Sequence, residues 1–308
     1  MRIAIFGSGG VGGYFGARLA AAGEDVTFLA RGAHLDAMQR DGLRITSPLG
    51  DLHLPKVQAA DRAQAIGPVD VVLFTVKLYD VETAAATLAP LIGPNTVVIT
   101  MQNGVDAMDM VARHVGVDHV AGGAAYIVAV IDKPGHIRHT VAQQLVFGER
   151  DGRRSDRLVA FEEAGIRAGY QAKASSDVQA DLWTKFVRLA TWSGMTTVTR
   201  APMGVVRGTP ETYEMMMAAI QEVIAVGQAK GIHFPADLMD GTLALIKNFP
   251  HGSKSSMLED LERGRRLELP WLSGAVVRIG REVGVPTPIH QFISTVLTPF
   301  VGGRQSVG

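Results

Sequence analysis

The chain opens with short apolar runs that alternate with stretches of helical spacing. An apolar strand, Arg2–Phe6, leads into glycines and then into a helix that stops at Gly23, and Asp25–Ala30 reads as a second strand. The alternation continues with strands over Val69–Val76 and Thr96–Thr100 and helices over Val81–Leu91 and Val105–Val115. This order predicts a parallel sheet with both faces covered.

The alternation of strands and helices gives way to helices alone near Ala174. Further strands are expected over Val120–Ile131, Gly135–Thr140 and Gln144–Gly148, followed by a helix over Leu158–Ala168 and a strand over Tyr170–Ala174. Beyond this point only helices are expected, over Val178–Ser193, over Met215–Lys230 after a start at Thr209-Pro210, and from Pro270 to a stop at Gly284. The sequence therefore predicts an α/β fold with two domains: a Rossmann domain with a doubly wound, mainly parallel sheet over residues 1–173, and an all-helical domain over 174–308.

Composition agrees with two domains and excludes several function classes. A chain of 308 residues exceeds the usual single domain, and 47% hydrophobic with 19% charged residues suits a soluble protein with a large core. Thirty basic and thirty acidic residues balance, so charge indicates neither a nucleic-acid nor a membrane partner. The chain has no cysteine, and its histidines show no metal-ligand spacing. Without a signal-peptide pattern or a long apolar run, the cytoplasm is the simplest location.

The first candidate site is the glycine-rich segment Gly7-Ser8-Gly9-Gly10-Val11-Gly12. It has the spacing G-x-G-x-x-G between a predicted strand and a predicted helix, which is the context of a dinucleotide fingerprint. Gly7 would permit the tight turn, Gly9 would let the backbone approach a pyrophosphate, and Gly12 would let helix and strand pack closely. The helix N-terminus would then offer N–H groups to the phosphates. The alternative is a glycine-rich turn of an ordinary α/β domain.

The end of the second predicted strand indicates which dinucleotide binds. An NAD site usually carries an acidic residue there to hold the ribose 2′-hydroxyl, but this chain has Arg31. A guanidinium is permanently charged and can contact two oxygens of a 2′-phosphate. The sequence therefore favours NADP over NAD, with a solvated charge at a strand end as the alternative reading of Arg31.

Three polar residues outside the glycine motif are candidates for chemistry. Lys77 and Asn103 each follow a predicted strand, where open α/β sheets bind ligands, so Lys77 could reach cofactor phosphate and Asn103 the nicotinamide. A surface lysine and an Asn-Gly turn are the alternatives. Lys185 interrupts an otherwise apolar helix. It would be a general acid with a lowered pKa if it is buried, or a solvent-facing lysine if it is not.

Taken together, these segments resemble the ketopantoate reductase (2-dehydropantoate 2-reductase) family over essentially the whole chain. The resemblance rests on the glycine motif, Arg31, Val76-Lys77, Gln102-Asn103-Gly104, Asp181-Leu182-Trp183-Thr184-Lys185-Phe186, and Ser255-Ser256-Met257-Leu258-Glu259-Asp260 with Glu268 beyond. It implies NADPH-dependent reduction of a 2-keto acid between the two domains, within pantothenate biosynthesis. It also implies that Lys185 donates the proton, that Glu268 lies on the cofactor side, and that Ser256 contacts the substrate carboxylate.

The chain departs from the family pattern where the substrate would bind. The family usually has asparagines at the positions that are Leu189, Ser193 and Met203 here. Ser193 is still assigned to the substrate, but a more apolar pocket is expected because three amide groups are lost. A substrate hydroxyl buried there without a partner would cost about 1–3 kcal/mol. The alternatives are therefore a reductase of ketopantoate, a reductase of a more apolar ketone or 2-keto acid, and a non-catalytic NADP-binding sensor. The oligomeric state stays open, with a homodimer as one candidate.

Overall fold

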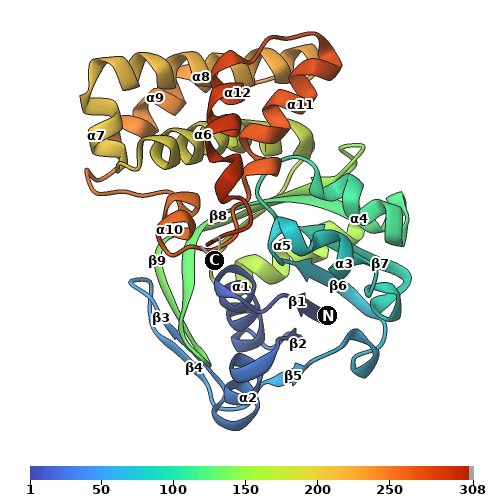
Figure 1. The fold of residues 1–308 in the computed structure, drawn as a ribbon. Helices are drawn as coiled ribbons and strands as arrows, with labels where there is room; N and C mark the ends of the chain where they lie inside the picture. The colour runs from blue at the N-terminus through green and yellow to red at the C-terminus, as the bar shows by residue number, and fades with distance from the viewer. Residues whose placement is uncertain (305–308) are drawn as a thin grey trace. The chain divides into compact units, whose positions relative to one another are not determined.

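The computed structural model of the protein describes residues 1–304, so residues 305–308 of the predicted second domain lie outside the described part. The chain folds into two units (Figure 1). Unit 1 comprises Met1–Gln102 and Asp106–Asp181, and unit 2 comprises Asn103–Val105 and the chain from Leu182 onward. The units thus divide within a helix, a few residues after the expected boundary, and a short stretch around Asn103 joins the helical unit.

Unit 1 is built on one ten-stranded sheet with a Rossmann core. The core strands lie in the order β5-β2-β1-β6-β7-β8, and every neighbouring pair among them is parallel. Their bounds are β1 Arg2–Phe6, β2 Asp25–Leu29, β5 Gln58–Ala60, β6 Val69–Phe74, β7 Ile92–Thr100 and β8 Val120–Lys133. This is the doubly wound order, in which successive core strands are added on one side of β1 as far as β5 and then on its other side from β6 onward. Such folds bind ligands at the point between β1 and β6 where the strand order reverses. The predicted fold class is confirmed.

A long antiparallel hairpin extends the sheet. Strand β8 turns back into β9, His136–Glu149, and the remaining strands pair beyond it: β3 Leu43–Thr46, β4 Leu52–Leu54 and β10 Gln171–Ala174. The prediction of two strands over Gly135–Thr140 and Gln144–Gly148 is wrong, because β9 runs through both. Ala142, with φ 56°, makes the irregularity between them, and the pairing register shifts nearby. The alternation of apolar and polar residues breaks near Ala142, as it would at the end of a strand, although β9 continues through this residue.

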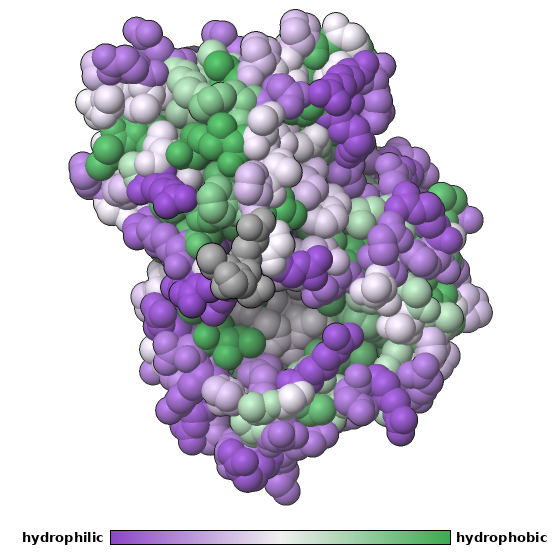
Figure 2. All heavy atoms as spheres, in the orientation of Figure 1, coloured by the Kyte–Doolittle hydropathy of each residue, from purple (hydrophilic) through white to green (hydrophobic). Residues whose placement is uncertain are grey.

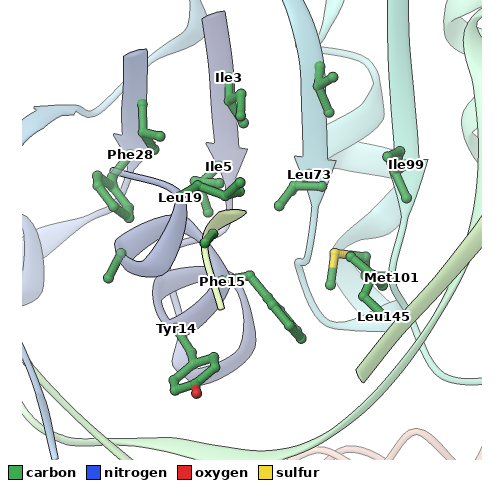
Figure 3. Close-up of a cluster of buried hydrophobic side chains, with 14 of the residues drawn as sticks. Ile3, Ile5, Tyr14, Phe15, Leu19, Phe28, Leu73, Ile99, Met101 and Leu145 are labelled. Carbon is green, nitrogen blue, oxygen red and sulfur yellow. The ribbon is translucent and has the colours of Figure 1, made fainter. Parts of the chain in front are cut away.

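Apolar residues of neighbouring strands form the core of unit 1. Ile3, Ile5, Leu73 and Ile99 lie on one face of the sheet, beside Phe15 of helix α1, Gly10–Ala21 (Figure 3). Side chains alternate along a strand, so the intervening residues lie on the other face. Those residues are buried as well: Ala4, Phe6, Val72, Phe74 and Val98. Both faces are therefore covered, as a parallel sheet requires.

The other helices of unit 1 are α2 Gly32–Asp41, α3 Val81–Ala85, α4 Ala107–Val115 and α5 Asp156–Arg167. The prediction of a single helix over Val81–Leu91 is wrong. Helix α3 ends at Ala85, and a separate 3-10 turn follows over Ala89–Leu91. Pro90 lies inside the predicted span, and proline cannot donate the backbone hydrogen bond that a continuing helix needs.

Unit 2 consists of helices, as predicted. They are α6 Val178–Thr199, α7 Met203–Gly208, α8 Pro210–Ala229, α9 Leu238–Asn248, α10 Ser256–Glu262, α11 Ser273–Val283 and α12 Pro288–Leu297. Helix α8 packs against α7, α11 and α12, which surround a second apolar core (Figure 1). The helix predicted to open at Pro270 begins only at Ser273, because Pro270 lies in a 3-10 turn and Leu272 has a non-helical backbone.

The surface is mixed in polarity. On the face shown in Figure 2, hydrophilic residues interrupt the hydrophobic ones throughout. Within residues 1–304, no helix has both the length and the apolar character needed to cross a membrane.

Candidate functional site

The glycine motif forms the turn between β1 and α1. Gly7 has φ 104°, a conformation that side chains other than glycine's rarely adopt. A Cβ at Gly9 would meet no atom within 4 Å, whereas a Cβ at Gly12 would lie 2.4 Å from Thr75 Oγ1 and 2.6 Å from the Gly7 carbonyl. The loop is therefore open at Gly9 and closely packed at Gly12, which is the division of roles expected for a pyrophosphate-binding turn.

The start of α1 is suited to an anion. Its N-cap residue is Gly9, and no side chain caps the helix there. The first N–H groups of a helix have no partner within the helix, and they carry its positive dipole end. A phosphate would satisfy these donors, so the backbone of Gly10, Val11 and Gly12 fits the dinucleotide predicted from the motif.

Two glycines of this segment have a packing role that the motif does not explain. A Cβ at Gly10 would lie 2.0 Å from the Ala129 carbonyl oxygen of β8, and one at Gly13 would lie 2.1 Å from Ile137 Cδ1 of β9. The hairpin therefore passes directly against the start of α1. The Ser8 side chain is also occupied, because its hydroxyl donates to the Leu29 carbonyl at 2.9 Å and the residue is buried.

Side chains at the ends of β6 and β7 hold the loop from the other side. Thr75 Oγ1 donates to the Gly7 carbonyl at 2.6 Å. Gln102 Nε2 donates to the carbonyls of Phe74 and Val76, at 2.9 and 3.1 Å. The two Gln102 bonds fix the strand end that leads to Lys77, which is exposed beside the point where the strand order reverses. Sequence reasoning missed Thr75, because it lay inside the predicted strand Val69–Val76, whereas the observed strand ends at Phe74.

Arg31 occupies the place predicted for it. It follows β2, is exposed, and serves as the N-cap residue of α2. In unit 1, Arg31 and Lys77 thus supply positive charge at the carboxyl ends of β2 and β6, next to the glycine turn. Such charges favour a phosphorylated ligand.

Unit 2 brings Lys185, Asn103 and Glu268 together. Lys185 lies on α6, partly buried, and its Nζ donates to Asn103 Oδ1 at 3.2 Å. Burial lowers the pKa of Lys185 to about 8, and the negative charge of Glu268 opposes the shift. Glu268 is itself buried, with 6% of its surface exposed. The alternative reading of Lys185 as a solvent-facing lysine does not fit the structure, because the side chain is partly buried and its ammonium is hydrogen-bonded to Asn103.

The remaining substrate candidates differ in their surroundings. Leu189 and Ser193 follow Lys185 at spacings of four residues and so share its face of α6. Ser193 is fully buried, and its hydroxyl has no hydrogen-bond partner among the described residues. Met203 is fully buried in the apolar core of unit 2, and Leu189 packs against that core. Leu189 and Met203 therefore add apolar surface to unit 2 at two of the three positions, whereas Ser193 keeps a polar hydroxyl at the third.

Ser256 is exposed at the first position of α10. The residue before it, Ser255, is buried and caps the helix by accepting from the Leu258 N–H at 3.1 Å. Thr196 Oγ1 on α6 donates to Ser255 Oγ at 2.8 Å. This bond ties the start of α10 to the helix that carries Lys185. Sequence reasoning named Ser256 but missed Thr196, whose role depends on a contact distant in the chain.

The comparisons with known proteins identify the family to which the chain is similar. The family model described as "Ketopantoate reductase PanE/ApbA" matches residues 3–152, and that of its C-terminal part matches residues 177–300. The 2-dehydropantoate 2-reductase of Mesorhizobium japonicum is 33% identical over 94% of each chain, and that of Archaeoglobus fulgidus is 32% identical, also over 94% of each chain. The crystal structure of the Geobacter metallireducens GS-15 enzyme superposes with a TM-score of 0.92 at 29% identity, covering 97% of this chain and 99% of the other.

The fold and these matches define an oxidoreductase that interconverts a ketone and an alcohol. The chain belongs to the ketopantoate reductase family. Its activity is of the 2-dehydropantoate 2-reductase type, and the family indicates a nicotinamide cofactor.

Proposed function

We propose that the protein is an NADPH-dependent reductase that converts a 2-keto acid into a 2-hydroxy acid, with ketopantoate as the first candidate substrate. The observation that carries the proposal is the Lys185 environment: a partly buried ammonium with a pKa of about 8, hydrogen-bonded to Asn103 and near the charge of Glu268. A general acid is most effective when its pKa lies near the working pH.

Unit 1 would hold the cofactor. The backbone of Gly9, Gly10 and the following turn would bind the pyrophosphate, where the open space at Gly9 and the uncapped start of α1 support a phosphate. Arg31 would bind the 2′-phosphate, and Lys77 would approach the phosphates from the neighbouring strand end. An arginine in place of the acidic residue of NAD sites supports NADPH over NADH.

Unit 2 would supply the proton and bind the substrate. NADPH, when bound, supplies a hydride to the carbonyl carbon. The Lys185 ammonium stabilises the negative charge that develops on the carbonyl oxygen and then donates a proton to it. Asn103 accepts from the same ammonium and so fixes its direction. Ser256 would bind the substrate carboxylate, and Ser193 would offer its unpaired hydroxyl to the substrate.

A more apolar 2-keto acid is the second candidate substrate. Leu189 and Met203 lie in or against the apolar core of unit 2, at positions where the family has polar amides. A site built to pair a substrate hydroxyl can reject the analogue without it by about 10⁴-fold, whereas an apolar pocket discriminates far less.

The test is a panel of 2-keto acids that differ only in a side-chain hydroxyl, assayed by the loss of NADPH absorbance. We expect turnover of ketopantoate and of its deoxy analogue with kcat/KM values well within 10⁴-fold of each other. NADPH binding without turnover of any 2-keto acid would contradict the proposal and favour a non-catalytic sensor.

A further inference from the structure

His34 connects three separate parts of unit 1. It lies in the first turn of α2, three residues after Arg31. Its Nε2 lies 2.9 Å from the carbonyl oxygen of Ser8 in the glycine turn. Its Nδ1 accepts the N–H of Gly135, in the turn between β8 and β9, at 3.1 Å. One imidazole ring therefore bridges the glycine turn, the hairpin and the helix that begins at Arg31.

The two contacts define the protonation state of the ring. A backbone N–H can only donate, so Nδ1 must be the nitrogen without a proton. The ring proton is then on Nε2, from which it is donated to Ser8. A doubly protonated ring would present an N–H to the Gly135 N–H and lose that bond. Burial lowers the pKa of His34, with the Ser8 contact opposing the shift, so the neutral form that bridges both groups is the favoured one.

The Ser8 contact completes the anchoring of the glycine turn. The Ser8 N–H and hydroxyl both donate to the Leu29 carbonyl, at 3.0 and 2.9 Å, and the Ser8 carbonyl accepts from His34. Its neighbours Gly7 and Gly9 have no side chains to restrict them, and glycine loses much conformational freedom on ordering. Fixing Ser8 at all its polar groups therefore preorganises the turn before a ligand arrives.

The Gly135 contact holds the opposite side. Gly135 has φ 72°, and a Cβ there would lie 3.1 Å from Ala37 Cβ of α2, so the hairpin turn packs directly on this helix. The Gly135 carbonyl accepts from the Arg44 N–H at 2.9 Å. With the bond to His34, both backbone polar groups of Gly135 are paired, and α2 is held between the hairpin and the glycine turn.

We infer that His34 is a positioning residue for the cofactor, which holds the glycine turn and Arg31 in a common register so that the pyrophosphate and the 2′-phosphate of NADPH bind at once. This inference rests on the proposed function, because it assumes that the turn binds pyrophosphate and that Arg31 binds the 2′-phosphate. His34 itself would contact neither the pyrophosphate nor the 2′-phosphate, because both of its ring nitrogens bond to backbone groups. Its contribution is to cofactor affinity and not to the chemical step, since Lys185 belongs to the other unit.

The test compares three variants by fluorescence titration with NADPH and by steady-state kinetics. His34→Leu removes both ring contacts, His34→Asn can place an amide only near Nδ1, and His34→Gln can place one near Nε2. We expect His34→Leu to raise the NADPH Kd and KM about three- to tenfold, the range of one or two hydrogen bonds, with kcat at saturating NADPH unchanged. His34→Gln should restore most of the affinity, and His34→Asn should not.

His119→Leu is the matched control. His119 also contacts a backbone carbonyl in unit 1, that of Thr96 at 2.9 Å, but it does not touch the glycine turn. Its loss should leave the NADPH Kd within twofold of the wild type. An unaltered Kd in His34→Leu would overturn the inference, as would equal losses in His34→Leu and His119→Leu.

The wild-type chain provides a second measurement if His34→Leu does not fold. Nitrogen NMR of the histidine rings should find His34 neutral with its proton on Nε2, and NADPH should shift its signals. A ring protonated on Nδ1, or signals insensitive to NADPH, would contradict the inference. These outcomes differ from failure of the proposed function. NADPH binding without turnover of any 2-keto acid would contradict that function alone, whereas a wild-type chain that binds no NADPH would contradict both proposals.

Discussion

Lys185 offers the sharpest test of the catalytic assignment, because its pKa of about 8 differs from the ordinary value of 10.5. With that pKa, about 90% of the side chain is protonated at pH 7 and about 10% at pH 9. If the protonated form is the proton donor, kcat/KM should fall about tenfold between these two pH values. An ordinary lysine would stay protonated over the same range, and the profile would be flat.

Three substitutions separate the effects of the Lys185 proton, the Lys185 charge and the Glu268 charge on this pH dependence of kcat/KM. Lys185→Met should lower kcat by about 10²–10⁴, the usual worth of general acid catalysis, with the NADPH Kd little changed. Lys185→Arg keeps the charge but does not titrate below about pH 12, so its residual activity should lack the alkaline fall. Glu268→Gln removes the charge that raises the pKa of Lys185, so the fall should begin at lower pH.

The assay is NADPH oxidation followed across pH 6–10 at saturating and limiting 2-keto acid. Lys247→Met is the control, because Lys247 is an exposed lysine on α9 of the same unit. Its profile should match that of the wild type. The reasoning is refuted if Lys185→Met keeps near-normal kcat, or if the wild-type profile is flat between pH 7 and pH 9.

Further predictions concern the cofactor turn and the α10 cap. Arg31→Ala should weaken NADPH binding by about 1.5–3 kcal/mol and leave NADH nearly unchanged, whereas equal losses in a fluorescence titration would contradict the 2′-phosphate assignment. Gly12→Ala, whose Cβ would lie 2.4 Å from Thr75 Oγ1, should lower the free energy of unfolding by about 1–3 kcal/mol. Gly9→Ala should fold with near-normal stability but lose NADPH affinity, and urea titration of both variants checks the contrast. Ser255→Ala should cost about 0.5–2 kcal/mol in the same measurement, because the α10 cap and the Thr196 contact are lost together; unchanged stability would show that the cap is not needed.

The sequence predicts the Rossmann core well because its signals are local. The glycine spacing, the strand before it and the strand ending at Arg31 all lie within the first 31 residues, and the structure has them nearly as expected. The errors have physical causes. Pro90 ends α3 within its predicted span, and the unusual backbone of Ala142 interrupts the alternation inside the single strand β9.

The candidate site could be predicted only where a residue is unusual in its own segment. Lys185 is recognisable as a lysine in an apolar helix, although the sequence alone left its burial undecided. The His34 bridge joins residues 26 and 101 positions away, and the Thr196 hydroxyl contacts Ser255 from 59 positions away. Such contacts depend on the tertiary structure, so no local sequence pattern predicts them.

The central claim is tested most directly by following the transferred hydrogen. The purified protein would be incubated with ketopantoate and NADPH that carries deuterium at the reactive position of the nicotinamide, and the product would be analysed by mass spectrometry. The account predicts a 2-hydroxy acid with deuterium on the former carbonyl carbon, formed much more slowly by Lys185→Met and more slowly with deuterated NADH. A protein that binds NADPH yet forms no labelled hydroxy acid from ketopantoate or from any apolar 2-keto acid would contradict it.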